Sequence, residues 1–89
     1  MSEVCKFTFA SGITKEMIEE QIVASVVSAE CTFGQSRVRL HAGYATSDGK
    51  AVIEVDSDVG EHIAQVFTGL MIRKIGEENF TVEWVKDKE

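Results

Sequence analysis

The sequence predicts an α+β fold in which an antiparallel sheet carries two helices on one face. Segments with strand-like alternation of polar and apolar residues are separated by segments whose apolar residues recur at helical spacing. Glycine-containing turns divide these segments. A chain of 89 residues is expected to form a single domain, 1–89, around one core. We expect the ordered core to cover about residues 4–85, with fraying at 1–3 and 86–89.

A first strand and a first helix are expected at the start of the chain. The strand covers residues 4–10, and its core face holds Cys5, Phe7 and Phe9. Thr14 is a favourable N-cap residue for a helix that runs to about Ser28. The stripe of this helix that faces the core consists of Ile18, Ile22, Val26 and Ala29.

A β-hairpin is expected in the middle of the chain. Residues 35–45 alternate, and their apolar face holds Val38, Leu40, Ala42 and Tyr44. Asp48-Gly49 suits a tight turn, so residues 51–57 are expected to be the returning strand. In an alternative interpretation, the first strand of this pair begins near Glu30 and contains a bulge at Gly34.

A second helix and a final strand complete the chain. Asp58 and Glu61 have the spacing of a capping box at the start of this helix, and Gly76 is placed to end it. The final strand covers residues 80–85. The order β-α-β-β-α-β predicts a ferredoxin-like sandwich with strand order 4-1-3-2, whose two helices share one face of an antiparallel sheet.

This arrangement assigns every strand residue to a covered or an open face. The expected core consists of Phe7, Phe9, Leu40, Tyr44, Ile53, Val55, Ile63, Phe67, Leu70, Val82 and Trp84. The expected open face consists of Lys6, Thr8, Arg37, Arg39, His41, Val52, Glu54, Asp56, Thr81, Glu83 and Val85. We expect Cys5 to be buried and chemically inert.

The composition disfavours several classes of protein. Fifteen acidic and nine basic residues give a net charge of −6, which disfavours nucleic acids and anionic membranes as partners. The central strands of the open face lack the stacking aromatics of RNA-binding domains. The two cysteines form no CxxC pair, so we expect reduced thiols in a cytoplasmic protein. No sequence motif implies a cofactor, a phosphate-binding loop or a zinc helix.

One polar constellation is expected on the open sheet face. Counting from the turn, Tyr44 opposes Ile53 and His41 opposes Asp56, with Glu54 diagonal to the histidine. A histidine beside two carboxylates could act as a general base or hold a divalent ion. Because no nucleophile or third strong ligand accompanies them, we interpret these residues as a solvated cross-strand ion pair. We therefore expect no catalytic residues and no metal site.

The second half of the chain resembles the NIL domain, a small ferredoxin-like module related in architecture to ACT domains. The matching stretches are Phe33-Gly34, Arg39-Leu40-His41, Val52-Ile53-Glu54-Val55, Asp58-x-x-Glu61 and Thr81-Val82-Glu83. The apolar run 69–72 departs from the family pattern. The resemblance implies small-ligand sensing or regulation, with self-association and without enzymatic activity.

The expected function is therefore a non-enzymatic regulatory or ligand-sensing domain. The alternatives are a protein-interaction adaptor without a small ligand and a small cofactor-free enzyme that uses His41. We also expect a homodimer, since the open face combines valines with charges of both signs. The candidate interface consists of Arg37, Arg39, Val52 and Val85. The other surface through which two copies could pair is the expected edge strand 35–45, which has no proline to block pairing.

Overall fold

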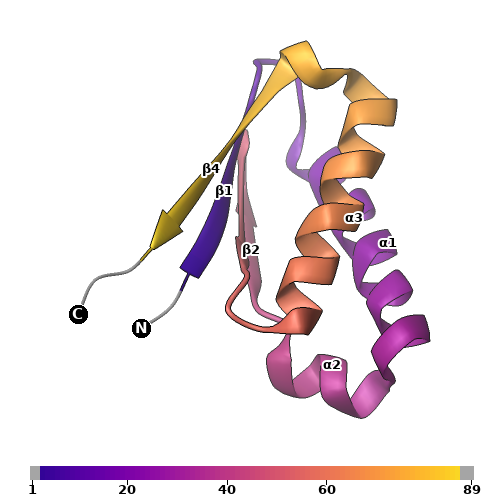
Figure 1. Ribbon diagram of the computed structural model, residues 1–89. Coiled ribbons are helices and arrows are strands. Elements are labelled where there is room, and N and C mark those ends of the chain that lie inside the picture. The colour runs from indigo at the N-terminus through magenta and orange to yellow at the C-terminus, as the bar shows by residue number, and fades with distance from the viewer. Residues whose placement is uncertain (1–2, 87–89) are drawn as a thin grey trace.

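The computed structural model describes residues 3–86, which form an α+β fold with a four-stranded antiparallel sheet and three helices. In chain order the elements are β1 (Glu3–Phe9), α1 (Lys15–Phe33), α2 (Gln35–His41), β2 (Tyr44–Ser47), β3 (Lys50–Glu54), α3 (Asp58–Ile75), the 3-10 turn η1 (Glu77–Asn79) and β4 (Phe80–Lys86). The strand order is β2-β3-β1-β4, which is the expected order read from the opposite edge. The helices lie on one side of the sheet (Figure 1).

The strand β1 lies at the centre of the sheet and carries much of the core. It pairs antiparallel with β3 on one side and with β4 on the other. Its odd-numbered residues face the helices, as expected, and Cys5, Phe7 and Phe9 are all buried. The Phe67 ring of α3 packs edge-on against the Phe7 ring, with the centroids 4.8 Å apart. This contact joins α3 to the central strand β1.

The first helix begins as expected and ends later than expected. The Thr14 hydroxyl accepts a hydrogen bond of 3.2 Å from the Met17 N–H, which confirms the predicted N-cap. The helix continues past Ser28 to Phe33 and stops at Gly34, whose φ of 93° suits glycine. Because residues 30–33 are helical, the alternative strand starting near Glu30 is wrong.

Residues 35–41 form the helix α2, so the strand predicted for this segment is wrong. Val38 is buried and Leu40 is 80% exposed, although an extended chain would place both on one face. Helical spacing instead aligns Val38 with Ala42, which packs against the core. The alternation was compatible with both structures, and burial of Val38 against α1 and α3 favours the helix.

The hairpin that follows has the predicted turn and register over a shorter length. Gly49 has a φ of 76°, as a tight turn requires, and Tyr44 opposes Ile53. The β2–β3 ladder runs from this pair to the turn, and the Glu54 N–H donates to the Gly43 carbonyl at 2.8 Å. The predicted strands 35–45 and 51–57 are thus reduced to Tyr44–Ser47 and Lys50–Glu54.

The helix α3 starts with a different cap from the one predicted. The Ser57 hydroxyl, and not the Asp58 carboxylate, accepts the capping bond from the Gly60 N–H at 3.1 Å. The predicted end is confirmed, because the Gly76 N–H donates to the Ile72 carbonyl.

The expected core is confirmed for the residues of the middle strands and α3, and it is wrong for residues of α2 and the edge strands. Phe7, Phe9, Ile53, Val55, Ile63 and Phe67 are buried as expected. Leu70 is half-buried, while Leu40, Tyr44, Val82 and Trp84 are exposed. These three residues of β2 and β4 point toward the helical side, but the helices bury the inward side chains of the middle strands, β1 and β3, more completely. The edge strands therefore keep their inward side chains partly in water.

The expected fraying of the ends falls partly outside the described residues. Residues 1–2 and 87–89 lie outside them. Glu3 and Lys86 do not fray, because they are register partners in the β1–β4 ladder.

Candidate functional site

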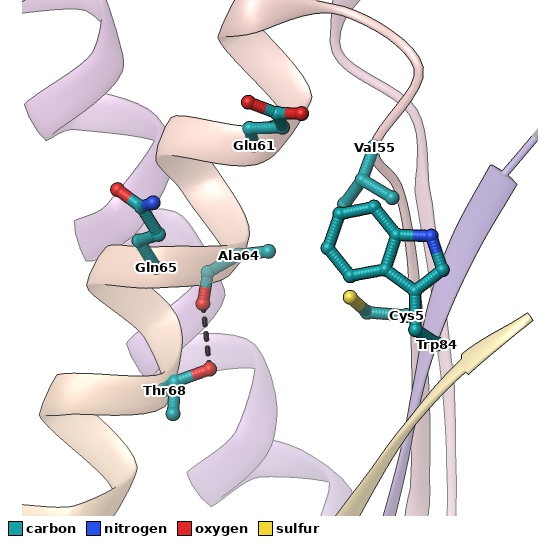
Figure 2. A pocket seen from close by; sticks show the side chains of 7 residues that line it. All are labelled: Cys5, Val55, Glu61, Ala64, Gln65, Thr68 and Trp84. Carbon is teal, nitrogen blue, oxygen red and sulfur yellow. Dashed lines mark hydrogen bonds between the residues drawn. The ribbon is translucent and has the colours of Figure 1, made fainter.

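A pocket opens between α3 and the β4 side of the sheet. Its volume is about 410 Å³, within the range of about 300–1,000 Å³ that is typical of small-molecule sites. The residues that line it are Cys5, Val55, Glu61, Ala64, Gln65, Thr68 and Trp84. Figure 2 shows the sheet residues on one side of this space and the α3 residues on the other.

The sheet wall of the pocket is apolar and is built by neighbouring strands. Cys5 and Trp84 are register partners on β1 and β4, and Val55 follows the end of β3. The indole ring lies beside Val55, above the Cys5 side chain (Figure 2). The indole N–H donates a hydrogen bond of 2.8 Å to the Glu3 carboxylate, which holds the ring in this orientation. Trp84 is 55% exposed, so much of the ring remains free for contact.

The α3 wall supplies the polar groups. Glu61, Gln65 and Thr68 follow one another at spacings of four and three residues, which places them on one face of the helix. The Thr68 hydroxyl donates to the Ala64 carbonyl at 2.7 Å, so its remaining capacity is to accept hydrogen bonds. Among the described lining residues, Glu61 is the one with a formal charge. The pocket thus offers one negative charge, the Thr68 hydroxyl as an acceptor, and the Gln65 amide, which can both donate and accept.

The charge of Glu61 also affects the thiol across the pocket. Burial raises the pKa of Cys5 above its ordinary value of 9.0, and the Glu61 carboxylate raises it further. The thiol therefore stays protonated at neutral pH, and a protonated thiol is a poor nucleophile. The expected burial of Cys5 is confirmed.

Close packing holds α3 at a short distance from the sheet. Gly60 in the first turn is buried, and a Cβ at this position would collide with the carbonyl group of Glu54. Glycine is thus the residue that lets the start of α3 lie directly on the end of β3. Glu61 is the next residue of the same helix, and Gln65 and Thr68 follow it within two turns, so this contact helps to set the position of the polar wall.

The polar constellation predicted on the open sheet face is dispersed. His41 is the last residue of α2, and Asp56 lies in the exposed connection after β3. The hairpin ladder ends near Gly43, so His41 and Asp56 are not opposed across strands. Glu54 remains on the open face, where its carboxylate lies against Gly43. Within residues 3–86, no three His, Cys, Asp or Glu side chains cluster as a metal site would require.

The candidate interface is split in the same way. Arg37 and Arg39 belong to α2 and are absent from the sheet, while Val52 and Val85 stay on the open face. The Arg37 guanidinium lies 5.0 Å from the centre of the Phe33 ring and 3.6 Å from the Asp58 carboxylate. Arg37 therefore helps to attach α2 to the ends of α1 and α3.

The residues of the pocket were visible in the sequence, but the pocket itself was not. Cys5 and Trp84 were both expected to face the helices from neighbouring strands. Trp84 was expected inside the core because it shares one face of the last strand with Phe80 and Val82. Polar residues at helical spacing beside the apolar stripe of α3 were the available signal for a partly open wall.

Comparisons of the chain with family models, curated proteins and solved structures find no match. In the described part of the chain, no helix has both the length and the apolar character needed to cross a membrane.

Proposed function

We propose that this chain is a non-enzymatic regulatory domain that binds a small ligand between α3 and β4. The observation that carries the proposal is the pocket formed by Cys5, Trp84 and the polar face of α3. A mostly apolar cavity with a few convergent polar groups is the usual form of a small-molecule site.

The lining points to an amine with a flat apolar body. The exposed face of Trp84 can stack on an apolar ring and attracts a cation. Glu61 supplies a negative charge, and Thr68 can accept a hydrogen bond. The site offers little to an anionic ligand, because Glu61 repels it. Nucleotides are therefore poor candidates within the broader class of ligands that a sensing domain recognises.

The alternative of an enzyme that uses His41 has less support. His41 is not among the residues that line the pocket. The thiol that does line it is held protonated, and a catalytic cysteine needs an accessible thiolate.

The fold proposal follows from the order of the strands. We infer a ferredoxin-like sandwich in which α2 is an additional helix between the first helix and the hairpin. The NIL-like character of the second half stays part of this proposal. The support for the sandwich is the sheet order β2-β3-β1-β4 together with long helices after β1 and β3. A cytoplasmic location is likewise part of the proposal.

A protein-interaction adaptor is the second candidate function. It is favoured by Val4, Val52 and Val85, which are half-buried neighbours on the open face. An adaptor of this kind would show no saturable response to small ligands, whereas a sensing domain would.

The first test of ligand binding uses the single tryptophan of the chain, Trp84, as its reporter. A thermal-shift screen of amines, amino acids and nucleotides is followed by titration of phenethylamine against indole fluorescence. Phenethylamine should quench saturably, whereas the anionic analogue phenylacetate should not. Glu61→Gln should weaken phenethylamine binding about tenfold, because it removes a charge-assisted interaction.

The matched control for this titration is Glu77→Gln, which removes an exposed carboxylate of η1 outside the pocket. Its dissociation constant should equal that of the unmodified chain. Equal weakening by both substitutions would indicate a general charge effect and would reject the assigned site. Absence of saturable quenching by any amine would favour the adaptor.

A further inference from the structure

The strand β4 presents free backbone groups along one edge of the sheet. It pairs with β1 on one side, and within the described residues no strand lies on its other side. The Ala10 N–H donates to the Asn79 carbonyl, which marks this pair as hydrogen-bonded in the β1–β4 ladder. Because the bonding direction alternates along a strand, Phe80, Val82 and Trp84 direct their N–H and C=O groups away from β1.

The same strand exposes apolar side chains that face the helical side. Val82 is 46% exposed and Trp84 is 55% exposed, because α3 does not extend over the edge. The free edge of β4 thus combines unpaired backbone groups with apolar side chains that are partly exposed to solvent. An edge of this kind is a template for pairing with another strand. The opposite edge, β2, has four residues against seven in β4, and its Thr46 hydroxyl is bonded to Glu19.

We propose that a second copy of this chain pairs antiparallel along β4, with Val82 opposite Val82 of the partner subunit. A two-fold axis at this position makes the contact self-complementary. It sets Phe80 opposite Trp84 on the helical side and Thr81 opposite Glu83 on the open side. Moving the axis to Glu83 would oppose two carboxylates and destabilise the pair.

Charges at the ends of the strand support the same register. Pairing at Val82 brings Lys86 of the partner subunit toward Glu78, which lies in the 3-10 turn η1 directly before β4. The two-fold axis repeats this contact at the other end. Both side chains are exposed in the single chain, so both are free to meet. The open sheet face offers weaker complementarity, because Arg37 and Arg39 lie on α2 instead.

Pairing along β4 also completes the pocket. The β4 side of the pocket is where Trp84 stands half exposed, and the partner subunit would place its Phe80 opposite this ring. The α3 helices of the two copies would then flank a shared cleft. This consequence rests on the proposed function, whereas the pairing rests on the strand edge alone.

The test is sedimentation velocity at tens of micromolar chain, with two substitutions that separate the candidate surfaces. Val82→Pro removes a backbone N–H that points to the free edge, a position at which an edge strand tolerates proline. The unmodified chain should sediment as a dimer and Val82→Pro as a monomer. The matched control Val52→Asp places a charge on the open face and should leave the dimer intact. Dilution of the dimer should shift the Trp84 emission to longer wavelength.

Two results would overturn the pairing. One is a monomeric unmodified chain at these concentrations, and the other is a dimer that survives Val82→Pro. Circular dichroism checks the fold of the proline variant. If it is unfolded, Lys86→Glu replaces it: this variant should weaken the dimer severalfold, and adding Glu78→Lys should restore it. Failure of the second charge reversal to restore it would reject the register.

Phenethylamine titration of the Val82→Pro monomer separates the two proposals. Weaker binding than in the dimer supports a pocket completed by the partner subunit. An unchanged dissociation constant would overturn that completion and leave both the dimer and the ligand site standing. Absence of binding to either form would reject the ligand site and leave the dimer.

Discussion

Single residues show where this small core carries its stability. Phe67 is fully buried and its ring contacts both Phe7 and Phe9 edge-on, with centroid distances of 4.8 and 6.2 Å. Aromatic pairs with this geometry contribute beyond the area they bury. Leu40, by contrast, is 80% exposed on α2. Phe67 and Leu40 were both predicted to lie in the core, but their contributions to the stability of the fold are expected to differ widely.

We expect Phe67→Ala to lower the free energy of unfolding by about 3–5 kcal/mol, because it removes a large side chain and leaves a cavity. This is close to the whole stability of many domains of this size. Leu40→Ala is the matched control and should change the stability by less than about 0.5 kcal/mol. Urea denaturation of both variants measures the difference. Equal losses would contradict the assignment of residues 35–41 to a helix.

The buried thiol of Cys5 should make stability fall at alkaline pH. Its pKa in the folded chain is raised above 9.0 by burial and then by Glu61. As pH rises past this ordinary value, the unfolded chain loses the proton while the folded chain keeps it, so unfolding becomes more favourable. The contribution is complete below pH 9.0 and is lost as pH rises through the higher folded pKa.

Urea denaturation between pH 7 and pH 10 measures this slope. Cys5→Ala should flatten it, because the titrating group is removed. Cys31→Ala should leave it unchanged, because Cys31 is exposed. A slope that follows Cys31 instead would contradict the role of burial.

At the scale of elements, the predicted structure is correct where local signals and tertiary contacts agree. The Asp48-Gly49 turn and the pairing of Tyr44 with Ile53 support one another, so the hairpin register was correct. Residues 35–41 had no such second signal. Their alternation of polar and apolar residues is typical of a strand. In the structure, however, Val38 and Ala42 both contact the core, and their spacing of four residues is typical of a helix. Local pattern alone does not choose between these.

The position of α3 depends on the absence of a side chain at Gly60. We expect Gly60→Ala to destabilise the fold by about 1–3 kcal/mol, because its Cβ would meet the Glu54 carbonyl group. Gly69→Ala on the same helix is the control, since among the described residues an added Cβ there meets open space. That change should instead stabilise by about 0.5–1 kcal/mol through helix propensity. Thermal unfolding of the two variants should therefore shift in opposite directions.

At the scale of the whole molecule, two long helices cover a sheet wider than they are. The inward side chains of the middle strands are buried, while those of β2 and β4 remain partly exposed to solvent. On the β4 side this mismatch produces both the pocket and the free edge. The ligand site and the dimer surface that we propose thus have one common geometrical origin.

The sequence by itself determined the strands β1 and β4, the two long helices with the cap at Thr14 and the stop at Gly76, and the turn at Gly49. These depend on periodicity, capping and backbone conformation, which act between near neighbours in the chain. Only the tertiary structure decided that residues 35–41 are helical and that Trp84 lines a pocket. The first depends on burial of Val38 against α1 and α3, and the second depends on how far the helices extend over the sheet. Both are properties of packing between segments that are distant in the chain.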